Sequence, residues 1–338
     1  MRPTDLLDRA GSFARRNRWV WAALAVLVLW LVLSFATSRF SLSSLSGILL
    51  SASFLTIVGL GQMFVVVTGR GNIDLSIASV ITLNAYLALI TVGGTDAGLL
   101  LGLPTALAVG LLVGGANALL VVRLRIPAII ATLATGYVLA TATLLANRAI
   151  PGFAVSPTLR WLTAARIGGL PAMTLIAAGV VAMAAYVLRF TVYGRKLSAV
   201  GQSRAAARLA GIATGRIVAS AFLLSAVLAS LTGVLLGAYT GGAFLEMGQP
   251  YLLQSVAAVV LGGTLIFGGA ATALGTFLAS ILLVLIVTTM QILGLPPGAQ
   301  DMVQGLVVIL VLALAGRDAV ARPRRLLPPA PALPGARP

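Results

Sequence analysis

The chain has 338 residues, of which 59% are apolar and only 9% are charged; a water-soluble domain carries about 25% charged residues, so this composition excludes a soluble enzyme. Its 23 basic and 7 acidic residues give a net charge of +16, but the arginines lie in short gaps between apolar runs, which is typical of a membrane protein and argues against nucleic-acid binding. The absence of cysteine and histidine excludes thiol and imidazole catalysis, and we expect no metal site.

Apolar runs long enough to cross a bilayer recur along the chain, because a spanning helix needs about 20 apolar residues. They predict an all-α polytopic membrane protein with about ten transmembrane helices in a permease domain at 19–316. The predicted spans are 19–37, 47–68, 74–92, 98–121, 128–146, 170–188, 217–240, 250–266, 271–293 and 302–316. The first run is too long for the apolar part of a typical signal peptide, so we expect it to be retained.

The basic residues indicate which loops face the cytoplasm. If the N-terminal segment 1–18 is cytoplasmic, most of the basic residues lie on that side, as the positive-inside rule requires. An even number of spans returns the C-terminus to the same side. There the tail 317–338 is rich in proline and arginine, which predicts disorder and contact with anionic lipid headgroups. We therefore expect a bacterial inner-membrane protein with both termini in the cytoplasm.

Glycine and proline interrupt the two halves of the chain in a similar way. Gly69 and Gly71 break an apolar run in the block 47–146, which Pro127 interrupts again later. In the block 217–316 the run is broken by Gly262, Gly263, Gly268 and Gly269, and then by Pro296 and Pro297. The two blocks begin on opposite sides of the membrane in this topology. Such paired interruptions suggest an inverted repeat with a transport path between its halves, although glycine and proline are also common in membrane helices generally.

The longest cytoplasmic loop, 189–216, contains the signals of a short helix. Ser203 is a good N-cap, the alanines after it favour helix, and Gly211 suits the position just past the last turn. A helix of about two turns is not stable alone in water. It must therefore lie against the bundle or the lipid headgroups, or dock a partner protein.

Four stretches of the chain resemble one family of membrane proteins, in the same order along the sequence. They are GQMFVVVTGRGNIDLS at 61–76, NALLVVRLRIP at 117–127, YGRKLSAVGQSRAAARLAGI at 193–212 and SVAAVVLGGTLIFGG at 255–269. The third resembles the ATPase-docking loop of ABC importer permeases of the ribose/monosaccharide type. The likeness covers nearly the whole chain, and the second and fourth stretches are more similar to the sugar group than to the branched-chain amino-acid permeases.

The resemblance implies that this chain is the permease subunit of an ATP-driven importer for a small polar solute, a monosaccharide such as ribose or a related pentose or hexose. A separate ATPase would hold ATP and Mg, a solute-binding protein outside would deliver the solute, and a second permease subunit, identical or different, would complete the path. The chain itself should bind no cofactor and is not expected to be an enzyme. Its single lysine, Lys196, is not part of a phosphate-binding Gly-x-x-x-x-Gly-Lys-Ser/Thr sequence.

Two departures from the family pattern leave alternatives open. Family docking loops usually carry acidic residues before Ala-Ala-Arg, where this chain has Arg204 and Ala205, so its ATPase should present a different charge. The stretch Gly69-Arg-Gly-Asn72 is longer than the commoner Gly-Gly form, which leaves a nucleoside, a furanose signal or a branched-chain amino acid as alternative solutes. A self-sufficient secondary transporter is a further alternative, but proton coupling usually needs acidic or histidine relays within the spans.

Three groups of candidate site residues follow from the loops and spans. The ATPase-docking candidates are Ser203, Arg204, Ala205, Ala206, Ala207, Arg208, Leu209, Ala210 and Gly211. The substrate-pathway candidates are Gln62, Asn72, Asp74, Asn84, Asn117 and Gln254. Candidates for docking the solute-binding protein, with lipid headgroups as the alternative contact, are Arg148, Arg160 and Arg166.

The pathway candidates have a structural alternative as well as a functional one. Amides suit a neutral polyol because they donate and accept hydrogen bonds without charge, but they also bond between helices. Asp74 is a functional candidate because acidic groups near spans are costly. The structural alternative, which we favour, is that Asn72 or Asp74 caps the third span or that Asp74 pairs with Arg70.

Overall fold

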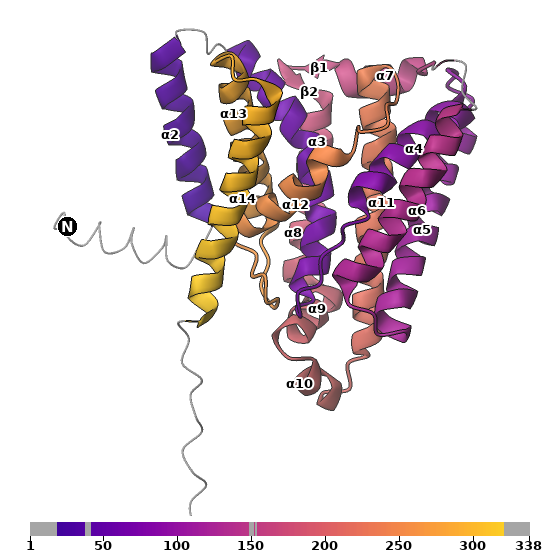
Figure 1. Cartoon of the computed structure of the whole chain (residues 1–338), viewed down its shortest axis with the longest axis vertical. Coiled ribbons are helices and arrows are strands. Elements are labelled where there is room, and N and C mark those ends of the chain that lie inside the picture. The colour runs from indigo at the N-terminus through magenta and orange to yellow at the C-terminus, as the bar shows by residue number, and fades with distance from the viewer. Residues whose placement is uncertain (1–18, 38–41, 149–151, 153, 321–338) are drawn as a thin grey trace, which may run out of the picture.

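The computed structural model describes residues 19–37, 42–148, 152 and 154–320. Figure 1 shows a bundle of helices with small elements at its two ends. In chain order the elements are α2 (Trp19–Thr37), α3 (Leu42–Val67), α4 (Ile77–Val92), α5 (Leu99–Ala118), the π-helix η1 (Leu119–Arg123), α6 (Ala128–Arg148), α7 (Pro157–Ala164), β1 (Arg166–Ile167), β2 (Leu170–Pro171), α8 (Ala172–Phe190), α9 (Val192–Gln202), α10 (Arg204–Leu209), α11 (Thr214–Thr240), α12 (Gln249–Leu261), α13 (Ala273–Ile292) and α14 (Pro297–Val320).

The helices confirm the prediction of an all-helical polytopic membrane protein, since each predicted span coincides with a helix. By length and composition, six helices in the described part of the chain can cross a membrane, so the predicted number of about ten transmembrane helices is not confirmed. They are Leu45–Val67, Leu99–Arg123, Ala128–Arg148, Ala172–Phe190, Thr214–Thr240 and Ala273–Ile292.

Two of the predicted spans are shorter than the sequence suggests. Helix α4 has 16 residues and α12 has 13, fewer than the roughly 20 that cross the hydrocarbon. Each follows a non-helical segment, 68–76 before α4 and 241–248 before α12. The two helices approach one another near their N-termini, where the Gly248 N–H donates to the Thr82 hydroxyl at 3.1 Å. The apolar runs overestimate the lengths of these two helices, because non-helical backbone inside a bundle has the same apolar composition as the helix beside it.

Helix α11 lies at the centre of the bundle and packs against α3, α4 and α5. Glycines allow this close approach. A Cβ at Gly114 of α5 would lie 2.8 Å from Leu223 Cα, and one at Gly233 of α11 would lie 2.3 Å from Ile81 O. Small residues at helix contacts are the usual means by which membrane helices pack tightly.

The two ends of the bundle carry different elements, as Figure 1 shows. Helices α9 and α10 lie at one end, called here the α10 end; α7 and the antiparallel pair β1–β2 lie at the other, called the α7 end. The η1 helix, which ends at Arg123, reaches the α10 end, since Val122 lies beside Gly215 just after α10. The bundle therefore separates most of the described arginines from the three on the α7 end.

Several elements differ from the sequence-based expectation. Helices α7 and α9 and the β1–β2 pair were not anticipated, because they are short and weakly apolar. Helix α14 extends to Val320, beyond the expected end of the span at 316. The N-terminal segment 1–18 and the rest of the C-terminal tail, 321–338, lie outside the described residues.

Candidate functional site

Helix α10 has the caps that its sequence predicts, although it is shorter than the expected Ser203–Ala210. The Ser203 hydroxyl accepts a hydrogen bond from the Ala206 N–H at 3.2 Å. At the other end Gly211 has a φ of +76°, and its N–H donates to Arg208 O while the Ile212 N–H donates to Ala207 O. This pattern is a Schellman motif, which favours glycine because a side chain is strained at positive φ.

One side of α10 is anchored in the protein and the other is free. Ala207 is only 3% exposed and packs in a cluster with Leu197 and Val200 of α9. Leu209, two residues on, is 92% exposed. Ala207, one of the predicted docking residues, is therefore inaccessible to a partner, and a tryptophan there would overpack the chain's own core. The exposed docking candidates are Ser203, Ala205, Ala206, Arg208, Leu209, Ala210 and Gly211.

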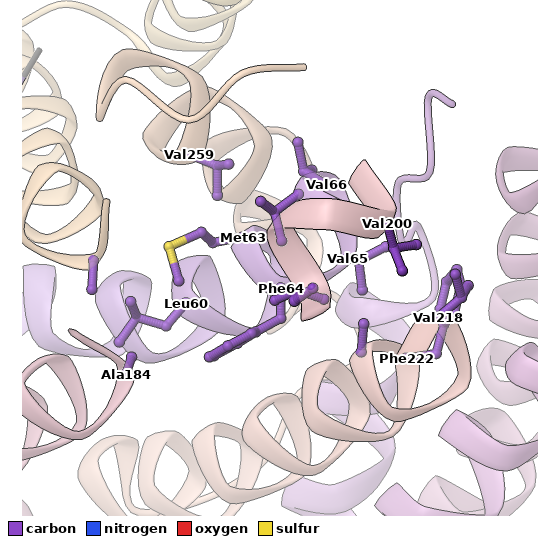
Figure 2. Close-up of a cluster of buried hydrophobic side chains, with 14 of the residues drawn as sticks. Leu60, Met63, Phe64, Val65, Val66, Ala184, Val200, Val218, Phe222 and Val259 are labelled. Carbon is purple, nitrogen blue, oxygen red and sulfur yellow. The ribbon is translucent and has the colours of Figure 1, made fainter. Parts of the chain in front are cut away.

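The anchoring cluster joins α9 to the centre of the bundle, as Figure 2 shows. Leu60, Met63 and Phe64 enter it from α3, and Phe222 enters it from α11. Val200 brings α9 into contact with these helices. The short helices α9 and α10 therefore share one densely packed core with α3 and α11.

A second link at the α10 end is made by glycine backbones. The Gly269 N–H, in the loop between α12 and α13, donates to Val67 O at the end of α3 at 3.0 Å. Gly201 of α9 lies between them: a Cβ there would be 1.9 Å from Val67 O and 2.4 Å from Gly269 N. A Cβ at Gly69 would be 2.7 Å from Phe267 O. We call Gly69, Gly201 and Gly269 the glycine contact.

The glycine contact explains the paired interruptions seen in the sequence. The loop 68–76 leads into the short helix α4, and the loop 262–272 follows the short helix α12. The two interrupted segments of the predicted repeat blocks therefore touch, and the end of α9 touches both. The glycines of the two blocks could be predicted to interrupt helices from the sequence, but the role of Gly201 could not, because it depends on contacts with residues far away in the chain.

Asp74 lies at the centre of a buried polar network rather than beside Arg70. Its carboxylate accepts from the Ser76 hydroxyl at 2.6 Å, from the Ser76 N–H at 3.0 Å and from the Ser225 hydroxyl of α11 at 2.8 Å. The Asp74 N–H donates to Gln62 Oε1 at 3.3 Å. Arg70 is exposed. The network fastens the start of α4 to α3 and α11, and a carboxylate next to a helix N-terminus is favourable.

The structure brings together three of the six pathway candidates. Asn117 joins Gln62 and Asp74 by donating to the Ser76 hydroxyl at 2.9 Å. The other three lie apart from this network. Asn72 donates to the Thr68 hydroxyl, Asn84 donates to Val80 O within its own helix, and Gln254 donates to Gln304 of α14.

Gln254 is the pathway candidate that borders a pocket beside the first turn of α12. This pocket has a volume of about 270 Å³. Its lining side chains include the polar groups of Ser51, Thr240, Tyr251, Gln254, Thr288 and Gln291. A second pocket of about 150 Å³ is bordered by Gln249 and Thr82. Both pockets adjoin the first turn of α12. This position could not be predicted from the sequence, in which 250–266 has the composition of one continuous span.

The three arginines proposed to meet a binding protein all lie on the α7 end and are exposed. Arg148 ends α6, Arg160 lies on α7 and Arg166 lies on β1. An acidic residue shares this surface: Asp96, between α4 and α5, accepts from the Thr158 N–H at 2.9 Å. That hydrogen bond holds the pKa of Asp96 below its usual range. The surface is therefore basic but not free of acid.

The fold and these sites are those of a membrane transport subunit, with pockets beside α12 that carry some polar side chains and an anchored, capped helix at one end. In the described part of the chain no cluster of acidic residues could hold a metal ion. Residues 44–312 match the family described as branched-chain amino acid transport system / permease component, and the chain belongs to this family of ABC importer permeases.

Curated relatives are similar over almost their full length. The autoinducer 2 import system permease protein LsrC of Enterobacter sp. (strain 638) is 35% identical, over 92% of this chain and 91% of the relative. The LsrC protein of Yersinia pseudotuberculosis serotype O:3 (strain YPIII) is 33% identical, over 90% of this chain and 87% of the relative. The LsrC protein of Escherichia coli O9:H4 (strain HS) is 32% identical, over 93% of this chain and 92% of the relative. No solved structure matches this chain.

Proposed function

We propose that this chain forms the membrane path of an ATP-driven importer for a small polar solute of the sugar type, and that α10 docks a separate ATPase subunit. The observation that carries the proposal is the two-sided α10: Ala207 is fixed in the core, and Leu209 is free. A docking element must be stiff and mechanically connected to the path. The cluster around Val200 and the glycine contact supply such connections to both short helices.

The solute class rests on the relatives and on the pockets. The relatives are named as import permeases for autoinducer 2, and autoinducer 2 is therefore the first solute to test. Ribose, other pentoses and hexoses follow. The pocket beside Gln254 carries hydroxyl and amide groups and no described charge, which suits an uncharged polyol. A branched-chain amino acid would bring two charges into this pocket without a partner, which is costly.

The function is tested by uptake into vesicles that contain this chain, its ATPase and its binding protein. We expect ATP-dependent uptake of radiolabelled autoinducer 2 or ribose, and no uptake when ATP is left out. An excess of unlabelled leucine should not compete. Uptake driven by an ion gradient without ATP would contradict the proposal and favour a secondary transporter, whereas competition by leucine would assign the amino-acid alternative.

In the proposed topology the chain crosses the inner membrane about ten times, with both termini and the α10 end in the cytoplasm. Most of the described basic residues lie at the α10 end, on the short helices α9 and α10 and in the segments next to them, and segments rich in lysine and arginine resist export. A solute-binding protein would then dock at the α7 end, against the exposed Arg148, Arg160 and Arg166. Opposite charges on that protein would raise the rate of association.

Single cysteines test this topology, because the native chain has none. Ala205→Cys on α10 and Arg160→Cys on α7 are both exposed. We expect an impermeant maleimide added to intact cells to label Arg160→Cys and to label Ala205→Cys only after the membrane is opened. Ser156→Cys would not serve, because the Ser156 side chain is buried as the N-cap of α7. Labelling of Ala205→Cys in intact cells would invert the topology.

A further inference from the structure

Three arginines lie near one another at the α10 end: Arg204 and Arg208 of α10, and Arg70 of the loop 68–76. Arg204 is partly buried, and the Nε and Nη2 atoms of its guanidinium are shielded from solvent and have no hydrogen-bond partner among the described residues. Burial, together with the nearby charges of Arg70 and Arg208, lowers the pKa of Arg204 from its usual value. Arginine nevertheless keeps its charge in proteins. We call Arg70, Arg204 and Arg208 the arginine cluster.

The described chain places no carboxylate against the arginine cluster. Asp74 is occupied in the polar network by Ser76 and Ser225, and Asp96 is bonded to Thr158 at the α7 end. The remaining acidic residues are Asp5, Asp8, Glu246, Asp301 and Asp318. A partly buried cation without a partner is costly, so the isolated subunit holds Arg204 in an unfavourable state.

The unpaired atoms have a definite chemical preference. Nε and Nη2 lie on the same edge of the guanidinium plane, so together they can donate two parallel hydrogen bonds to one carboxylate. A protein partner is further indicated by Leu209, which lies next to Arg208 and is 92% exposed. A large apolar side chain on an exposed helix, beside an unpaired charge, fits an interface with an apolar centre and charged pairs around it.

We propose that the arginine cluster receives an acidic side chain of the ATPase subunit, which binds Arg204 through Nε and Nη2 while Leu209 enters an apolar pocket beside it. The proposal rests on the docking role of α10 proposed above. Because both atoms are shielded, Arg204 must turn outward, or α10 must shift, to reach the carboxylate. Docking therefore relieves an unfavourable charge and favours the displaced arrangement of α10, since a ligand shifts an equilibrium through its differential affinity for two states.

The first test measures the dissociation of the ATPase from nanodiscs that contain this chain. We expect Arg204→Glu to weaken binding by at least about tenfold, and Arg204→Lys to weaken it less, because lysine keeps the charge but loses the two parallel bonds. Arg216→Glu is the matched control, since Arg216 is an exposed arginine of the same end outside the cluster. Equal effects of the Arg204 and Arg216 changes would overturn the proposal.

The second test identifies the partner residue. A photo-crosslinker on Ala205→Cys marks the ATPase surface that faces α10. Changing the acidic partner residue in that surface to arginine should weaken binding of the ATPase to the native permease. The same change should restore binding to the Arg204→Glu permease. The absence of any acidic residue from the crosslinked surface, or failure of every such exchange to restore binding, would overturn the proposal.

Two further experiments test whether an anion other than an acidic residue of the ATPase binds Arg204. In nanodiscs of neutral lipid only, the effect of Arg204→Glu should persist; its loss would assign the cluster to an anionic headgroup. The variant Asp5→Asn/Asp8→Asn/Asp318→Asn should bind the ATPase as the native chain does. If it weakens binding as much as Arg204→Glu does, the partner of Arg204 is a carboxylate of this chain. If neither Arg204→Glu nor Leu209→Glu weakens ATPase binding, the docking role of α10 is wrong. If Leu209→Glu weakens binding and Arg204→Glu does not, α10 docks the ATPase but the proposed acidic partner of Arg204 is wrong.

Discussion

Replacing Leu209 by glutamate should abolish recovery of the ATPase with this chain, while the chain still reaches the membrane at its normal level. Leu209 is 92% exposed in the isolated subunit, so the change should alter the free energy of unfolding by no more than about 0.5 kcal/mol. At a docking interface, truncation of a central apolar anchor costs about 2 kcal/mol or more. That corresponds to a loss of affinity of roughly 30-fold.

The measurement is co-purification of the ATPase and ATP-dependent uptake in the same cells. Ala213→Glu is the control for charge, because Ala213 is an exposed residue of the same loop at the start of α11. Ala206→Pro provides a second, conformational test: it removes the bond to the Ser203 hydroxyl and disfavours helical Ala205. Normal ATPase recovery with both Leu209→Glu and Ala206→Pro would make α10 a passive surface helix.

Replacing Gly201 by alanine should uncouple transport from ATP hydrolysis without preventing ATPase docking. The added Cβ would lie 1.9 Å from Val67 O and 2.4 Å from Gly269 N, and real Cβ atoms do not approach other atoms so closely. Either α9 must move away, or both the end of α3 and the loop 262–272 must, which costs about 1–3 kcal/mol of overpacking. The exposed side of α10 is unchanged, so we expect ATPase recovery to stay normal and uptake to fall at least about tenfold.

The control for Gly201→Ala is Gly179→Ala in α8. A Cβ at Gly179 meets no atom within 4 Å, and alanine is favoured over glycine in a helix by about 0.5–1 kcal/mol. This variant should therefore transport normally. Thermal stability of the purified complexes distinguishes uncoupling from general destabilisation. Wild-type uptake by Gly201→Ala would show that the glycine contact does not transmit motion.

The local features of the loop 189–216 could be predicted from the sequence because they depend on neighbouring residues. A serine before a run of alanines marks a helix start, and a glycine after it marks the end, since each acts through hydrogen bonds within a few positions. Ser203 and Gly211 both occupy the expected positions. The accessible side of α10 could not be predicted in the same way, because alanine at 207 and leucine at 209 give no amphipathic signal in six residues.

The polar network shows a similar limit. Asp74, Gln62 and Asn117 could be selected from the sequence as costly polar groups in apolar surroundings. Their grouping could not, because Asp74 bonds to Ser225, which is 151 residues away in the chain. Ser225 carries no signal of its own among the many serines of apolar helices. The alternative pairing of Asp74 with Arg70 was plausible from sequence spacing and is absent from the packed structure.

By itself the sequence determined that this protein is a helical membrane protein, because composition and apolar run length report directly on transfer into lipid. It also determined that a short capped helix lies in the loop 189–216, because caps act through neighbouring residues. Only the tertiary structure decided that α4 and α12 are short helices whose N-terminal ends approach each other, that Ala207 is anchored while Leu209 is free, and that Gly201 lies between Val67 and Gly269. These properties arise from contacts between segments far apart in the chain, and close packing, rather than local propensity, sets which of those contacts can form.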